Sequence, residues 1–232
     1  IFSMAEDITQ NPHDKFFKEA FSNKERAIEL FKQFLPKEIV EATDWETLER
    51  IPDSFISQSM RESRSDLLFE VQLSGVPVQL YCVFEHQSTQ DKHMPLRLLG
   101  YMVQIWERFV KEHPNNTKLP PIIPLVLHQS LSNWQTSEQF QEILDIPDHI
   151  RDELDASQPR FAHLLIDLPE ISDIGRFHMR LAVVFKIMRT VEEKNIVESL
   201  EQVAKFLSEA LKEDDDIAFL RTCFNYLLRA DV

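Results

Sequence analysis

The sequence predicts an α/β protein whose core follows the order helix, three strands, helix, strand, with further helices after it. The first observation is that the spacing of apolar residues changes from a helical period to a period of two, and back, within residues 1–130. The second is a turn over residues 74–77 that joins two apolar runs closely, as in a β-hairpin. The third is a run over residues 122–127 that is almost wholly apolar and follows a helical segment, which is typical of a parallel strand covered on both faces.

The helices are predicted from apolar residues that return to one face. One helix is expected over residues 14–35, ended by Pro36, and a second over residues 94–110. Three more amphipathic helices are expected over residues 173–193, 196–213 and 216–230. The chain should therefore end in a helical region.

The strands are predicted from alternation of apolar and polar residues. Residues 65–73 and 78–87 form the two arms of the hairpin, residues 48–57 give a weaker strand around Pro52, and residues 161–168 give one more. We therefore expect a core over residues 12–130, a connecting region with one further strand over residues 131–170, and a C-terminal helical region over residues 171–232.

The composition excludes several functional classes. Three glycines in 232 residues are too few for a Gly-rich nucleotide-binding loop, and two lone cysteines build neither a disulfide framework nor a zinc cluster. No apolar run approaches the roughly 18 residues of a membrane helix. Residues 1–5 lack the basic and apolar stretches of a signal peptide. We expect a cytoplasmic protein with no membrane partner.

The net charge of −14 argues against a globally basic nucleic-acid-binding protein. The excess of acidic groups is unevenly distributed along the chain. Residues 1–130 carry 14 basic and 19 acidic groups, whereas residues 131–232 carry 11 basic and 20 acidic groups. Most of the acidity therefore lies outside the expected core. A nucleic-acid substrate is not excluded, but its binding should be weak and sensitive to salt.

The hairpin contains the most informative residues. Asp66 begins its first arm and Glu85 lies near the end of the second, so both should lie at the same edge of the sheet. Alternation sends Glu85 and Gln87 to one face and His86 to the other, and Asp66 can share the face of Glu85. Two close carboxylates are costly in an interior unless they are solvated, protonated or bound to a cation, and with a backbone carbonyl they would suit Mg²⁺.

The simpler interpretation is that Asp66 and Glu85 are solvated residues at strand ends. Against it, four polar residues, 85–88, directly follow the apolar run 80–84. Strand ends at the edge of an α/β sheet are where functional residues concentrate.

Five motifs carry a resemblance to a known family. They are His13-Asp14-Lys15-Phe16-Phe17-Lys18, Ser65-Asp66-Leu67-Leu68-Phe69, Phe84-Glu85-His86-Gln87-Ser88, Met94-Pro95-Leu96-Arg97 with Tyr101, and Leu119-Pro120-Pro121-Ile122-Ile123-Pro124. In order and spacing, over about residues 12–190, they resemble the Rpn (YhgA-like) family of recombination-promoting nucleases, also described as transposases.

That family is similar to the PD-(D/E)XK, or restriction-endonuclease-like, superfamily of α/β nucleases. The resemblance implies that Asp66 and Glu85 are metal ligands, that the carbonyl of His86 completes the protein's share of ligands, and that Gln87 takes the place of the usual lysine. A glutamine can orient a water molecule but cannot neutralise developing negative charge. The cofactor implied is Mg²⁺, with Mn²⁺ or Ca²⁺ as alternatives, and the substrate implied is DNA.

Other residues could extend the site. Arg97 and Tyr101, spaced i to i+4, could hold a phosphate and stack a base, or could pair with an acid and pack in the helix core. Asp14 and Glu19 could face the metal, although solvation, or a helix N-terminal charge for Asp14, is the simpler interpretation. His128 ends the fourth strand and could line the same cleft, or be a strand-end histidine with its hydrogen bonds satisfied.

The leading hypothesis is a Mg²⁺-dependent endodeoxyribonuclease linked to DNA recombination, with Asp66, Glu85 and Gln87 as catalytic residues. A second is a weak or inactive nuclease fold that serves as a binding or regulatory module. A third is a transposase, for which the sequence supplies neither a third acidic partner nor a helix-turn-helix. The C-terminal helices either cap the core or pair with a second copy in a homodimer.

Overall fold

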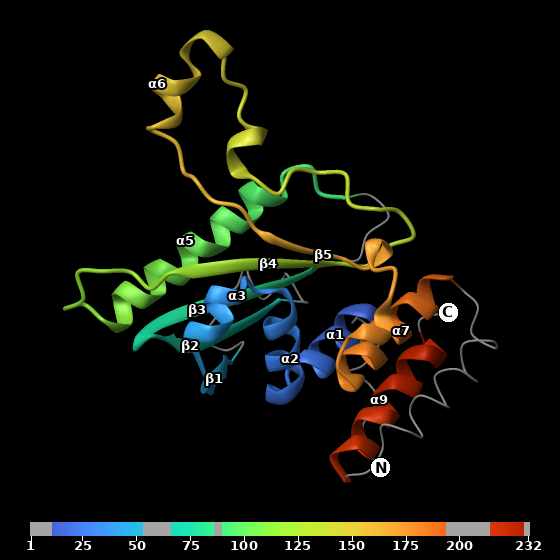
Figure 1. Ribbon diagram of the computed structural model, residues 1–232. Coiled ribbons are helices and arrows are strands. Elements are labelled where there is room, and N and C mark those ends of the chain that lie inside the picture. Colours follow the sequence, from blue (N-terminus) through green and yellow to red (C-terminus); the bar gives the residue numbers. More distant parts are fainter. Residues whose placement is uncertain (1–10, 53–65, 86–89, 194–213, 230–232) are drawn as a thin grey trace, which may run out of the picture.

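The computed structural model describes residues 11–52, 66–85, 90–193 and 214–229 of the chain. Its centre is a five-stranded sheet with the strand order β1-β2-β3-β4-β5 (Figure 1). The strands are β1 (Thr43–Ile51), β2 (Leu67–Leu73), β3 (Val76–Glu85), β4 (Ile122–His128) and β5 (Leu164–Asp167). The first three strands pair antiparallel and the last three pair parallel. The fold is therefore mixed α/β, as predicted.

The predicted hairpin is confirmed. Ser74 and Gly75 form a two-residue turn between β2 and β3, and their φ angles are +50° and +82°. Such turns match the twist of paired strands but need left-handed backbone at both positions, which glycine adopts without a steric penalty. The turn sets the register at Leu73↔Val76, and so brings Leu68 opposite Tyr81.

The helices lie on both faces of this sheet. They are α1 (Pro12–Phe21), α2 (Lys24–Phe34), α3 (Lys37–Ala42), α5 (Met94–Glu112), α6 (Arg151–Asp155), α7 (Met179–Glu193) and α9 (Asp214–Arg229). Of these helices, α3 and α6 were not predicted. Short 3₁₀ helices lie at Phe140–Ile143, Asp148–Ile150, Leu168–Glu170 and Ile174–Arg176. The helix expected over residues 94–110 is confirmed as α5, and that over 216–230 as α9. The helix expected over 196–213 lies outside the described residues.

The prediction of one helix over residues 14–35 is wrong. The chain breaks at residues 22–23, because the side chain of Asn23 accepts a hydrogen bond from the backbone N–H of Arg26 at 3.1 Å and begins α2 as its N-cap. Both helices keep their apolar faces on the same core, which is why the apolar period runs on across the break.

Two other elements begin five or more residues away from the predicted position. The helix expected from residue 173 begins at Met179, because Asp173 accepts a hydrogen bond from the N–H of Gly175 at 2.9 Å within a separate 3₁₀ turn. The weak strand expected at 48–57 is β1, which begins five residues earlier at Thr43; residues 53–57 lie outside the described ranges.

The two faces of the sheet have separate cores. Leu68, Tyr81 and Val83 pack against α5 on one face. On the other face α1, α2, α7 and α9 gather around a larger core that includes Phe17, Phe69, Phe185 and the C-terminal Cys223 (Figure 1). Cys82 and Cys223 are both buried and free. No helix in the described ranges is long and apolar enough to cross a membrane.

Candidate active site

Polar side chains meet at one edge of the sheet. Glu85, His128 and Asp167 are the last residues of β3, β4 and β5, and the parallel register places them side by side. Asp66 directly precedes β2, which runs antiparallel to β3, so it lies at the same edge. All four are buried, with exposed fractions of 3% for Asp66, 2% for Glu85, 0% for His128 and 6% for Asp167. These are not the solvated strand-end acids of the simpler interpretation.

Asp66 is held by a tyrosine from the neighbouring strand. The hydroxyl of Tyr81 donates a hydrogen bond to Oδ2 of Asp66. Burial, followed by the charge of Asp66, raises the pKa of Tyr81 well above its ordinary value. Tyr81 therefore remains a protonated donor, and the bond shows that Asp66 shares the α5-facing side of the sheet with Tyr81.

Glu85 is bound by Arg97 from the first turn of α5. Nη1 of Arg97 lies 3.0 Å from Oε2 of Glu85. The other oxygen, Oε1, is buried without a hydrogen-bond partner among the described residues. Burial raises the pKa of Glu85, while the charge of Arg97 opposes that shift. Arg97 thus stabilises the ionised carboxylate, and Oε1 is the oxygen left for another partner.

Arg97 itself is oriented by Tyr101. Its Nε donates to the Tyr101 hydroxyl at 3.3 Å, one helical turn away. Although burial alone lowers the pKa of Arg97, the bond to Tyr101 and the charges of Asp66 and Glu85 raise it. The ring of Tyr101 also meets that of Tyr81 edge-on, 5.7 Å between centroids. Arg97 is therefore a cation held in place by Tyr101. It forms an ion pair with Glu85 and interacts electrostatically with Asp66, the two predicted metal ligands.

The donor set at this edge fits a hard divalent cation. Two buried carboxylates, one with an oxygen that has no other partner in the described ranges, are the oxygen ligands that Mg²⁺ prefers. Within those ranges no three His, Cys, Asp or Glu side chains gather as a metal-binding group. The third ligand predicted from the resemblance is the backbone carbonyl of His86, which lies outside the described residues, as does Gln87.

His128 and Asp167 form a buried pair beside Glu85. Nδ1 of His128 lies 2.8 Å from Oδ1 of Asp167, and Oδ2 of Asp167 accepts a bond from the backbone N–H of Trp134 at 2.7 Å. Nε2 of His128 has no hydrogen-bond partner among the described residues. His128 is thus a strand-end histidine satisfied at one nitrogen and adjacent in register to the candidate metal ligand.

Asp14 and Glu19 are not brought to the carboxylate pair. Both belong to α1, which packs on the sheet face opposite α5. Asp14 stands in the first turn of α1, the position favourable for a negative charge at a helix N-terminus. Glu19 is exposed and lines a hollow between α1 and α9.

Two residues of this edge were not predicted from the sequence. Tyr81 is a polar ring inside an apolar strand on the face of Glu85, and Asp167 follows the apolar run 164–166 just as Glu85 and His128 follow theirs. The sequence signal that could have identified Asp167 is a polar residue at the end of each apolar run. To know which of these runs are neighbouring strands, one needs the register of the whole sheet.

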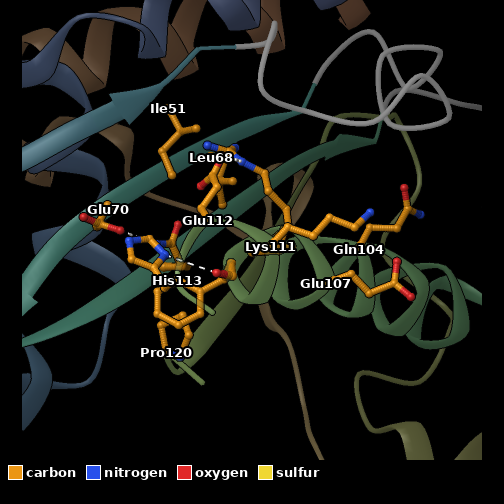
Figure 2. Close-up of a pocket in the computed structure, with 13 residues that line it drawn as sticks. Ile51, Leu68, Glu70, Gln104, Glu107, Lys111, Glu112, His113 and Pro120 are labelled. Carbon is orange, nitrogen blue, oxygen red and sulfur yellow. Dashed lines mark hydrogen bonds and ion pairs between the residues drawn. The ribbon is translucent and has the colours of Figure 1, made fainter. Parts of the chain in front are cut away.

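A separate hollow of about 290 Å³ lies at the other end of α5 (Figure 2). Ile51, Leu68 and Pro120 contribute apolar walls, and charged residues from the C-terminal half of α5 surround them. Its polar groups are mostly paired, since Gln79 donates to Glu70 at 2.6 Å and Arg108 to Glu112 at 2.8 Å. The carboxylates of the sheet edge do not line it.

The fold and this edge define an α/β protein with buried acidic residues gathered at one edge of its sheet. Residues 11–218 match the family model described as "Putative transposase, YhgA-like", and the chain belongs to this family. The resemblance predicted from the motifs is thereby confirmed.

Three curated relatives are similar over nearly the whole chain. The inactive recombination-promoting nuclease-like protein RpnE of Escherichia coli strain K12 is 28% identical over 97% of this chain and 73% of its own length. The recombination-promoting nuclease RpnD of Escherichia coli O157:H7 is 28% identical over 97% of this chain and 84% of its own length. The recombination-promoting nuclease RpnA of strain K12 is 29% identical over 97% and 75%. No solved structure gives a significant match.

Proposed function

We propose that this chain is a metal-dependent DNA endonuclease of the PD-(D/E)XK type that acts in DNA recombination. The observation that carries the proposal is the pair of buried carboxylates, Asp66 and Glu85, on one face and one edge of the sheet, with Arg97 acting on both. The names of RpnD and RpnA, both recombination-promoting nucleases, support the choice of reaction and substrate.

In this proposal Asp66 and Glu85 hold the cation, Mg²⁺ or Mn²⁺. A cation bound there lowers the pKa of a coordinated water and offsets negative charge on the phosphodiester. Tyr81 keeps Asp66 in place by donating to Oδ2, which orients the carboxylate. Arg97 fixes Glu85 through Oε2 and presents a permanent positive charge near the position where phosphate oxygens would lie. Gln87 is proposed to orient the attacking water.

The test is cleavage of supercoiled plasmid by purified protein with Mg²⁺, with Mn²⁺ and with chelator. Wild type should nick or cut with metal only. Glu85→Gln keeps the size of the side chain and one acceptor oxygen but removes its charge, and should lose all metal-dependent cleavage. Asp145→Asn, an acid outside the site, should cut like wild type. Equal cleavage by wild type and Glu85→Gln would mean a contaminating nuclease and would remove the assignment.

A second candidate is a nuclease fold that binds DNA without cutting it. The ion pair between Arg97 and Glu85 favours it, because the guanidinium already neutralises one of the two carboxylates. The name of the relative RpnE, an inactive recombination-promoting nuclease-like protein, also supports this candidate. A module of this kind would bind duplex DNA with chelator present and leave the plasmid supercoiled with either metal.

A further inference from the structure

A hollow between α1 and α9 carries a local excess of positive charge. It has a volume of about 460 Å³. Among the residues that the structure describes, its lining includes Lys15 from α1, Arg221 and Arg229 from α9, and one acid, Glu19. The chain as a whole has a net charge of −14. Three cations around one hollow therefore stand out from the average surface of this molecule.

The cationic residues of α9 lie along one stripe. Arg221, Asn225 and Arg229 recur at intervals of four residues, so they share a helix face, and all three are exposed. At 1.5 Å per residue the stripe is about 12 Å long. Each strand of a DNA duplex carries one phosphate per 3.4 Å of helix axis, so the stripe matches about three or four phosphates. Thr222 and Asn225 add hydrogen-bonding groups in the same wall.

The wall of this hollow is connected to the candidate active site. Tyr226 lines the hollow, and its hydroxyl oxygen lies 3.0 Å from Nε2 of Gln129, which donates to it. The backbone N–H of Gln129 donates in turn to the carbonyl of Glu85 at 3.0 Å. These two bonds place the inner wall of the hollow beside the end of β3, on the sheet face opposite the one that packs against α5.

We propose that the α1–α9 hollow binds the phosphate backbone of duplex DNA, beside the end of the sheet that holds Glu85. The inference rests on the proposed function for the choice of DNA as occupant. Charge is its main support: phosphate contacts from Lys and Arg supply most of the affinity of proteins that bind DNA without sequence preference.

The experiment measures binding of a short labelled duplex by fluorescence anisotropy, with chelator present and between about 50 and 200 mM salt. The variant is the pair Arg221→Gln and Arg229→Gln. The control is the pair Arg151→Gln and Arg160→Gln, which removes the same charge from α6 and the segment after it, at the opposite end of the molecule from α9 (Figure 1). Melting curves verify that all three proteins are folded.

The variant of the hollow should bind about tenfold or more weakly, and the slope of log affinity against log salt should fall by about 1.8, or 0.9 for each phosphate that is no longer neutralised. The control should keep the wild-type slope. Unchanged binding by the variant of the hollow, equal weakening in both pairs, or no binding by wild type at low salt would each overturn the proposal. Because no metal is present, these results are independent of cleavage: a chain that never cuts DNA can still pass this test, and one that cuts can fail it.

Discussion

The backbone N–H of Gln129 donates to the carbonyl oxygen of Glu85 at 3.0 Å, and this bond joins the candidate active site to the C-terminal helices. The side-chain amide of the same Gln129 lies 3.0 Å from the carbonyl of Met188 in α7 and 3.0 Å from the hydroxyl of Tyr226 in α9. Tyr226 in turn lies 2.6 Å from Nδ1 of His13 in α1. One buried glutamine therefore connects the end of β4 with three helices of the opposite face.

Replacing Gln129 should loosen those helices. Gln129→Leu keeps the approximate volume but leaves buried partners without their donor, so we expect a loss of about 2 kcal/mol in unfolding free energy. The substitution should increase the rate of amide hydrogen exchange more in α9 than in α5. Gln104→Leu, a replacement in α5 on the other face of the sheet, should change neither quantity. Equal protection of α9 in wild type and Gln129→Leu would show that the docking of α9 does not depend on this residue.

Arg97 should matter more than another arginine on the same helix. Arg97 and Arg108 both pair with a glutamate, at 3.0 Å and 2.8 Å, but the side chain of Glu85 is 3% exposed and that of Glu112 is 44% exposed. Arg97→Gln leaves a buried carboxylate without its cation and should cost about 2 kcal/mol, whereas Arg108→Gln should cost less than about 0.5 kcal/mol. Urea denaturation measures both.

Adding Glu85→Gln to Arg97→Gln completes the test of that pair. The double variant should recover part of the stability that the single arginine replacement loses, because it no longer buries an unpaired charge. Independent, additive losses would mean that the two side chains do not interact as the structure describes.

Tyr81 and Tyr101 differ in what their hydroxyls do. The hydroxyl of Tyr81 is a buried donor to Asp66, and that of Tyr101 accepts from Arg97 on a half-buried part of α5. Tyr81→Phe should therefore destabilise the protein by about 1–3 kcal/mol and weaken metal-dependent cleavage, while Tyr101→Phe should have the smaller effect on stability. A Tyr81→Phe protein as stable as wild type would contradict the assigned hydrogen bond.

His163 should make the protein less stable in mild acid. Burial lowers its pKa from 6.5 to about 4, so between these values the unfolded chain binds a proton that the native state does not. The contribution of His163 to the free energy of unfolding has its full value above pH 6.5. It falls by about 1.4 kcal/mol per pH unit as the pH drops toward 4. Urea denaturation from neutral pH to mildly acidic pH should show this slope in wild type and a shallower one in His163→Leu. The exposed His149→Gln should behave as wild type, and identical slopes in all three proteins would rule out the buried neutral imidazole.

The elements that sequence reasoning predicted are those whose pattern is local. The alternation of residues 65–73, the turn at Gly75 and the helical stripe of 94–110 each depend on neighbouring residues, and the structure has all three. The break between α1 and α2 was missed because Asn23 acts as a cap in the middle of a continuous apolar stripe. The hydrogen bond of the Asn23 side chain begins a second helix, although the apolar residues keep a helical period across the break.

The candidate site divides in the same way. Asp66 and Glu85 could be assigned to one face because a hairpin and alternation suffice for that inference. The partnership of Tyr81 with Asp66 lies within the same hairpin and follows from its register, which sets Leu68 opposite Tyr81. The pairing of Asp167 with His128 depends instead on the parallel register of β4 and β5. Long-range register of that kind has no signature in a single sequence.

The most direct test of the central claim, that Asp66 and Glu85 together hold a divalent cation, is the metal-induced shift in melting temperature. A cation that binds only the native state stabilises it by about 2.7 kcal/mol at a concentration one hundred times its dissociation constant. We predict that Mg²⁺ or Mn²⁺ raises the melting temperature of wild type and of Asp145→Asn, and leaves those of Asp66→Asn and Glu85→Gln unchanged. A wild type that does not respond to either metal, or variants that respond as wild type does, would contradict the account.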